Sequence, residues 1–164
     1  MPYPADSPGP VVHQPVHHDV DRAGVDPPAP PPDPLAGRRV LVLISGSIAA
    51  VKLPLLVSAL VKRGAEVRCV LTPSAARLVS PVALASLSRH PCYGDDDPWS
   101  AAAPRPLHVE LAEWAELVLL APLSATTLAR WVHGFGDTLV ASVLLACEAP
   151  VLVAPAMKIG RAHV

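Results

Sequence analysis

Small and hydroxyl-bearing residues recur at three places in this chain of 164 residues, each shortly after a run of apolar residues. The three segments are Ser45-Gly46-Ser47, Thr72-Pro73-Ser74 and Ser124-Ala125-Thr126-Thr127. Small residues let backbone N–H groups approach a phosphate, and the start of a helix favours its negative charge. The hydroxyls of the third segment could donate to the edge of a flat heteroaromatic ring. Capping of a following helix explains the same hydroxyls, so the residues alone leave both interpretations open.

One histidine and one lysine are further candidates for chemistry. His108 lies at the start of a segment that resembles a helix, and an imidazole can act as a general base or orient a carboxylate near neutral pH. A lone histidine at a helix start is also often structural. Lys158 ends the segment Pro155-Ala156-Met157-Lys158 and could attract a carboxylate. No metal site is predicted, because nothing rigid would hold the histidines near the N-terminus at ligand geometry.

The elements that would position these residues alternate between strand and helix. Four runs of mainly apolar residues, the first of them continuously apolar, predict buried strands at residues 40–44, 67–71, 117–121 and 151–154. Helices are predicted at residues 48–63, 74–79, 81–87, 108–115, 125–132 and 137–147, with Pro54 starting the regular part of the first one and a loop at residues 91–106. The alternation implies a parallel sheet covered by helices on both faces. Such sheets bind ligands at the carboxyl ends of their strands, where the candidate segments fall.

The overall composition limits the classes of function. Residues 1–36 hold 11 of the 21 prolines and are expected to form a disordered arm. The net charge of −1 and the absence of a basic stripe argue against nucleic acid as a partner. No apolar run is long enough to cross a bilayer, and the N-terminus lacks the layout of a secretory signal. The three widely spaced cysteines suit a reducing compartment, so we expect a cytoplasmic protein without membrane partners.

The segments together resemble those of the flavin-dependent cysteine decarboxylases, and among them most closely the phosphopantothenoylcysteine decarboxylases of coenzyme A synthesis. The resemblance covers residues 37–157. It is carried by Ser45-Gly46-Ser47-Ile48-Ala49-Ala50, by His108-Val109-Glu110-Leu111, by the segment 122–127 and by Ala154-Pro155-Ala156-Met157. It implies a three-layer flavodoxin-like or Rossmann-like domain that uses FMN to decarboxylate 4'-phosphopantothenoylcysteine to 4'-phosphopantetheine. It also implies a homo-oligomer, a trimer or an assembly of trimers, with the flavin between subunits.

The same resemblance implies a role for each site residue. The residues expected around the FMN phosphate are Gly46, Ser47, Ile48, Thr72 and Ser74. The residues expected along its ring are Ser124, Ala125, Thr126, Thr127 and Ala156. His108 would be the catalytic histidine. Lys158 stands where the family has an asparagine that holds the substrate carboxylate, and Thr126 stands where an asparagine is frequent.

The last residues, 159–164, read Ile-Gly-Arg-Ala-His-Val, which is what a common sequencing adapter encodes in one frame. We therefore expect residues 158–164 to be a non-native tail, and the flavoprotein domain at residues 37–157 to be incomplete and impaired in turnover. The alternative is a divergent but genuine terminus. For the function, the alternatives are a peptidyl-cysteine decarboxylase, a flavin prenyltransferase, or a non-catalytic member of the same fold that binds a partner protein.

Overall fold

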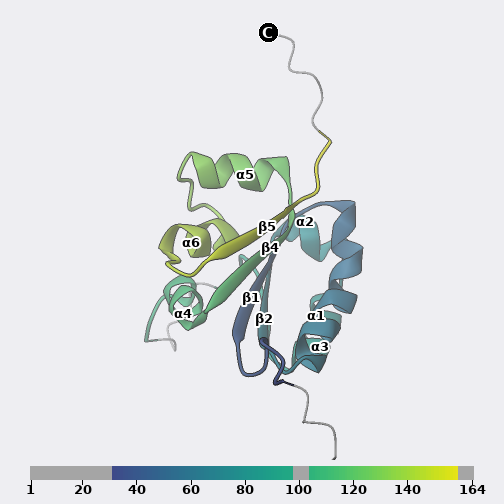
Figure 1. The fold of residues 1–164 in the computed structure, drawn as a ribbon. Coiled ribbons are helices and arrows are strands. Elements are labelled where there is room, and N and C mark those ends of the chain that lie inside the picture. Colours follow the sequence, from purple (N-terminus) through teal and green to yellow (C-terminus); the bar gives the residue numbers. More distant parts are fainter. Residues whose placement is uncertain (1–30, 98–103, 159–164) are drawn as a thin grey trace, which may run out of the picture. The chain divides into compact units, whose positions relative to one another are not determined.

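Runs of aliphatic residues form a five-stranded parallel sheet in the computed structural model, which describes residues 31–97 and 104–158 (Figure 1). In spatial order, the strands are β3 (Cys92–Tyr93), β2 (Glu66–Leu71), β1 (Arg39–Ile44), β4 (Leu117–Leu123) and β5 (Val151–Pro155). Val42 of β1 pairs with Cys69 on one side and with Leu119 on the other. The central position of β1 explains its continuous apolar sequence, because a strand inside a parallel sheet is buried on both faces.

Alternate side chains of β1 enter two separate hydrophobic cores. Val42 packs into a core that includes Val57 of α1 (Leu53–Lys62) and Leu84 of α3 (Pro81–Ser88). Leu43 packs into a second core with Leu111 of α4 (Leu107–Trp114), to which α6 (Leu139–Ala146) also contributes. The alternation follows from the two-residue period of a strand. The predicted α/β fold, a parallel sheet with helices on both faces, is therefore confirmed.

The first predicted helix is divided into two parts. Residues 48–52 form a 3₁₀ helix, η1 (Ile48–Lys52), and the regular helix α1 begins at Leu53. Pro54 lies in the first turn of α1, where its missing N–H leaves no hydrogen bond unmade, as predicted. Gly64 follows the helix with a φ of +83°, and a Cβ atom there would lie 3.2 Å from the Cα atom of Ala36. A glycine is required at this turn for both reasons.

Two strands differ from the prediction by two residues or more. β3 (Cys92–Tyr93) lies within the expected loop 91–106; with only two residues it has no periodic pattern to reveal it. β4 was expected to end at Ala121 but continues to Leu123, and its register with β5 shifts between Leu120 and Leu123. The shift includes Pro122, which has no N–H to donate to a neighbouring strand.

Two helices are shorter than expected. The helix predicted at residues 74–79 is the single turn α2 (Pro73–Ala76). The helix predicted at residues 137–147 is α6 (Leu139–Ala146), which starts two residues later because Thr138 is its N-cap. The hydroxyl of Thr138 accepts a hydrogen bond from the N–H of Ala141 at 3.2 Å, so this residue ends the preceding loop instead of continuing the helix.

Both ends of the chain extend beyond the described residues. Residues 1–30 of the predicted arm lie outside them, whereas Asp33 pairs with Arg63 at 2.8 Å and Leu35 packs against the first core. Of the predicted tail at 158–164, the described part contains only Lys158, which is exposed. Among the described helices, none combines the length and the apolar sequence needed to cross a membrane.

Candidate functional site

The strand order reverses between β1 and β4, and this reversal opens a crevice at the carboxyl end of the sheet. Ser45, directly after β1, is fully buried at this point. Its hydroxyl donates to the carbonyl oxygen of Pro122 at 2.6 Å and accepts from the N–H of Ser124 at 2.8 Å. Ser45 thus joins the loop after β1 to the loop after β4. Ser45 belongs to one of the candidate segments predicted from the sequence, but this positioning role was not predicted.

A cavity of about 330 Å³ lies at this edge of the sheet. Six of the residues predicted from the sequence line it, and they come from the ends of three neighbouring strands. They are Gly46, Thr72, Ser74, Ser124, Thr126 and Thr127. Five of the six carry a hydroxyl group, so the cavity is lined by groups that both donate and accept hydrogen bonds.

Gly46 brings the first two loops into direct contact. A Cβ atom at this position would lie 2.5 Å from the Cβ atom of Ser74, which is closer than two carbon atoms can approach. Ser74 belongs to the short helix α2, which follows β2. Only a glycine therefore allows the loop after β1 to lie against α2, and any larger residue would push apart two walls of the cavity.

Two of the predicted hydroxyls cap the helices that follow them. Thr72 accepts from the N–H of Ala75 at 3.2 Å, and Ser124 accepts from the N–H of Thr127 at 3.3 Å. Ser124 also donates to the hydroxyl oxygen of Thr127 at 3.2 Å. The capping interpretation is confirmed for Thr72 and Ser124. Capping uses only acceptor capacity, so the hydroxyl proton of Thr72 is still available to a ligand in the cavity.

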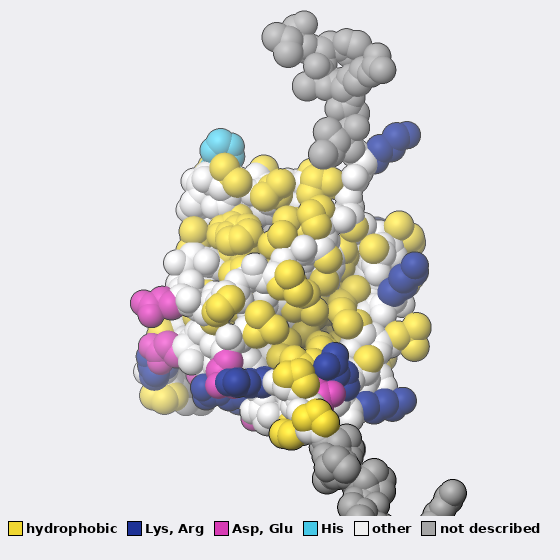
Figure 2. Space-filling view, in the orientation of Figure 1, with side chains coloured by type: hydrophobic (Ala, Val, Ile, Leu, Met, Phe, Trp, Pro, Cys, Tyr) yellow, Lys and Arg dark blue, Asp and Glu magenta, His cyan; other side chains and the backbone are white. Residues whose placement is uncertain are grey.

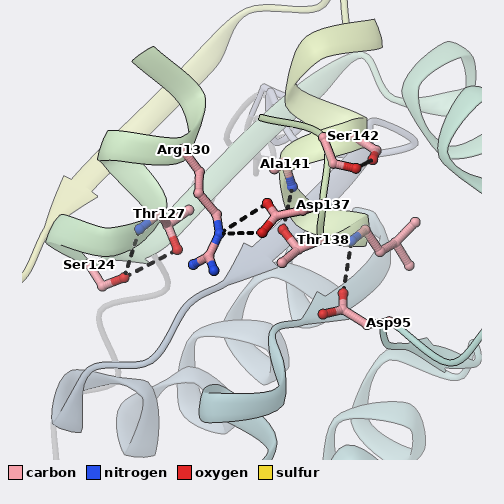
Figure 3. A network of polar contacts seen from close by, with 10 residues as sticks. Asp95, Ser124, Thr127, Arg130, Asp137, Thr138, Ala141 and Ser142 are labelled. Carbon is pink, nitrogen blue, oxygen red and sulfur yellow. Dashed lines mark hydrogen bonds and ion pairs between the residues drawn. The ribbon is translucent and has the colours of Figure 1, made fainter. Parts of the chain in front are cut away.

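Four charged or polar residues of the cavity were missed by the sequence analysis, namely Asp95, Arg130, Asp137 and Thr138 (Figure 3). Arg130 lies near the end of α5 (Ala125–Val132), and its Nε is 3.0 Å from each carboxylate oxygen of Asp137. Asp95 accepts from the N–H of Leu139 at 2.8 Å, so its negative charge lies at the start of α6, where the helix dipole favours it. The only sequence signal for the ion pair was the opposite charge of Arg130 and Asp137, which lie seven positions apart.

His108 lies beside this cavity rather than in it. It lines a second cavity of about 370 Å³, which shares Asp95, Asp137 and Thr138 with the first. The helix that carries His108, α4, is anchored by the fully buried Leu111. The structure therefore places His108 and the hydroxyl-lined cavity on two sides of the same three residues.

Arg68 of β2 contacts two residues of α4, Glu110 and Trp114. Its guanidinium carbon lies 4.4 Å from the ring centre of Trp114, a cation–π distance, and its Nη1 is 3.4 Å from a carboxylate oxygen of Glu110. Its Nε is buried and has no hydrogen-bond partner among the described residues. The two contacts tie α4, the helix that carries His108, to β2.

The five remaining predicted residues do not line either cavity. They are Ser47, Ile48, Ala125, Ala156 and Lys158. Ile48 and Ala125 are exposed at the starts of η1 and α5, and Ser47 is half-buried before η1. Ala156 follows β5 and its N–H donates to the carbonyl oxygen of Leu123 at 3.0 Å, whereas the side chain of Lys158 is exposed. Their roles in binding stay predictions.

Comparison with known proteins shows one consistent relationship. The chain is 40% identical, over 126 residues, to the coenzyme A biosynthesis bifunctional protein CoaBC of Bacillus subtilis. The aligned region includes 76% of this chain but only 30% of that protein. The chain thus spans less than a third of the length of this curated relative.

Solved structures give the same result at the level of the fold. A mutant PPC decarboxylase complexed with pantothenoylaminoethenethiol is 35% identical, with a TM-score of 0.67, over 74% of this chain and 68% of the other. The FMN-dependent cysteine decarboxylase SpaF is 30% identical, with a TM-score of 0.68, over 74% of this chain and 69% of the other. The model of the flavoprotein family matches residues 28–161. The chain therefore belongs to the flavoprotein family.

Proposed function

We propose that this chain binds FMN at the carboxyl end of its sheet and decarboxylates 4'-phosphopantothenoylcysteine to 4'-phosphopantetheine in coenzyme A biosynthesis. The observation that carries the proposal is the convergence of six predicted residues from three loops around one cavity. A second cavity, lined by His108, adjoins it. Volumes of about 300–1,000 Å³ are usual for cofactor and substrate sites, and each cavity exceeds the lower limit.

The donor groups of the first cavity suit a flavin nucleotide. Its phosphate would accept hydrogen bonds from the hydroxyls of Thr72 and Ser74, beside the loop that contains Gly46. The ribityl chain and the ring edge would meet the hydroxyls of Thr126 and Thr127. When bound, the flavin would supply the electron acceptor that makes the loss of CO₂ feasible.

His108 is the residue that we propose as catalytic. Its place in the second cavity allows its imidazole to donate a hydrogen bond to the substrate carboxylate, or to hold a proton beside it. Arg68 and Leu111 keep α4 in place while this happens. The buried Ser45 keeps the two halves of the FMN cavity together, so the substrate would meet a preorganised site.

Decarboxylation of a peptidyl cysteine by the same flavin chemistry is the second candidate. The similarity to SpaF, an FMN-dependent cysteine decarboxylase, at 30% identity and a TM-score of 0.68, supports a cysteine carboxyl group as the one removed in either candidate. Under either candidate, binding of the substrate carboxylate would be impaired. Lys158 stands at the position of the family asparagine, and a lysine cannot accept a hydrogen bond. Flavin binding with reduced turnover is therefore part of the proposal.

We also propose a homo-oligomer, a trimer or an assembly of trimers. Hydrophobic side chains gather on the face over β5 and α1 (Figure 2). Leu152 of β5 is 60% exposed and Leu55 of α1 is 76% exposed. Apolar patches of this kind on a sheet edge mark interfaces with other chains. The mass of the purified protein in solution tests this part. We place the protein in the cytoplasm, which the three free cysteines support.

Titration of the purified chain with FMN, followed by release of CO₂ from 4'-phosphopantothenoylcysteine, tests the function. We expect tight binding of FMN and a preference for this substrate over a peptide with a C-terminal cysteine. His108→Asn should keep the FMN affinity and lower the rate by about 10²–10⁴, the usual contribution of a general acid or base. A protein that does not bind FMN would contradict the proposal, and faster turnover of the peptide would favour the second candidate.

A further inference from the structure

We propose that Arg130 binds the phosphate of the flavin nucleotide through the two terminal nitrogens of its guanidinium group. The inference rests on the proposed binding of FMN and gives a role to a residue outside the candidate segments. Arg130 lines the same cavity as Thr72 and Ser74, which are the other groups expected near the phosphate.

The orientation of Arg130 is fixed by one end of its guanidinium group. Nε lies 3.0 Å from both carboxylate oxygens of Asp137, so the side chain is held against the loop before α6. The two terminal nitrogens make no hydrogen bond with the described residues and point away from Asp137 (Figure 3). With 36% of its side chain exposed, Arg130 is accessible from the cavity without being a free surface residue.

The charges of the cavity give the arginine a specific function. Arg130 is the only cationic side chain among the described residues that line it, and Asp95 and Asp137 are both carboxylates. Without Arg130, a phosphate would enter a space with two negative charges and no positive one. Asp137 is occupied by Nε, and Asp95 by the N–H of Leu139. The cationic nitrogens that remain can therefore pair with a phosphate, a partner that matches the planar fork of arginine.

The remaining lining residues favour a phosphate over the face of a ring. The cavity is lined by hydroxyl groups, and no aromatic side chain is among the described residues that line it. A phosphate has three oxygens that accept hydrogen bonds, whereas the face of an isoalloxazine ring needs an apolar or aromatic surface. Thr72, Ser74 and the free end of Arg130 supply the hydrogen-bond donors that the phosphate oxygens need.

Affinities for FMN and for riboflavin, which has the same ring without the phosphate, show whether Arg130 binds the phosphate or the rest of the flavin. Arg130→Gln should weaken FMN binding about tenfold to a hundredfold, as expected for loss of a charge-assisted contact, and leave riboflavin binding within about twofold. The matched control is Arg105→Gln, since Arg105 is also held by a carboxylate, Glu113 at 2.7 Å, and lies outside the cavity. An equal loss for both flavins, or no loss for FMN, would overturn the inference.

The variant Asp137→Asn tests whether Arg130 binds the phosphate or only holds Asp137 in place. If Arg130 only held Asp137, this variant would lose FMN affinity as Arg130→Gln does, and the inference would fail. If Arg130 binds phosphate, the variant removes a nearby negative charge and FMN binding should stay equal or become tighter. Arg130→Lys keeps the charge and should recover part of the FMN affinity, which protects the test against a glutamine variant that does not fold.

The native chain distinguishes failure of this inference from failure of the proposed function. Equal affinities for FMN and riboflavin in the unsubstituted protein would show that the phosphate contributes nothing, which contradicts the role of Arg130 but not flavin binding. A native chain that binds neither flavin would contradict both.

Discussion

Replacing Ser45 by alanine removes the hydrogen bonds that join the two sides of the candidate site. The lost contacts are the 2.6 Å bond to the carbonyl oxygen of Pro122 and the 2.8 Å bond from the N–H of Ser124. The Pro122 oxygen keeps a backbone partner, the N–H of Ser45 at 3.3 Å, whereas the Ser124 N–H loses its only described one. An unsatisfied donor costs about 1–3 kcal/mol and a lost hydrogen bond about 1 kcal/mol, so Ser45→Ala should lower the free energy of unfolding by about 2–4 kcal/mol.

Urea denaturation measures this loss, and the chain contains a matched control. Ser86 donates to the carbonyl oxygen of Val82 at 2.9 Å on an exposed face of α3, so Ser86→Ala should change the free energy of unfolding by at most about 0.5 kcal/mol. Ser45→Ala should also weaken FMN binding, because the loops after β1 and β4 are no longer joined. Equal stability of the two serine variants would refute the reasoning that the buried bridge, and not simply a serine hydroxyl, holds this part of the sheet.

Four further predictions concern the site, the core, a thiol and the pH. Gly46→Ala should reduce FMN affinity at least about tenfold in a titration, since its Cβ would lie 2.5 Å from a neighbouring carbon atom; unchanged affinity would mean that this loop is not part of the site. Leu111→Ala, at a fully buried position, should cost about 2–5 kcal/mol in urea denaturation, and a cost below about 1 kcal/mol would contradict the packing described for α4. Burial raises the pKa of the Cys92 thiol to about 12, so a thiol reagent at mildly alkaline pH should label Cys92 only after denaturation; rapid labelling of the native protein would show that β3 is open. The hydrogen bond from Arg63 lowers the pKa of Asp33, and the resulting stabilisation is present above the unfolded-state pKa and lost as the pH falls through the folded-state value. The denaturation midpoint of Asp33→Asn should therefore lie below that of the native chain at neutral pH and converge with it in acid, and a constant difference would exclude this origin.

The strands and the place of the site could be predicted because they depend on local patterns. The four mainly apolar runs each became a strand, and in a parallel sheet all carboxyl ends meet at one edge. That rule was enough to bring Gly46, Thr72 and Ser124 together without knowledge of the strand order. The capping roles of Thr72 and Ser124 were also predictable, because a hydroxyl at the end of a strand and before a helix serves the same local function in most proteins.

The missed residues depend on contacts that no local pattern specifies. Arg130 and Asp137 meet only because α5 and the loop before α6 turn back on each other. Asp95 follows a strand of two residues, which is too short for a periodicity to appear, and its partner Leu139 is 44 positions away in the sequence. The polar wall of the cavity is therefore a product of tertiary packing, whereas its hydroxyl groups are a product of local sequence.

The three residues shared by the two cavities, Asp95, Asp137 and Thr138, form a wall common to both. Charge placed on one side changes the electrostatic environment of the other, because the same carboxylates face both. An anion that paired with Arg130 in the first cavity would leave the charge of Asp137 less compensated in the second, which His108 also lines. A wall that belongs to both compartments therefore couples them electrostatically, so that the charge of an occupant on one side would be felt on the other.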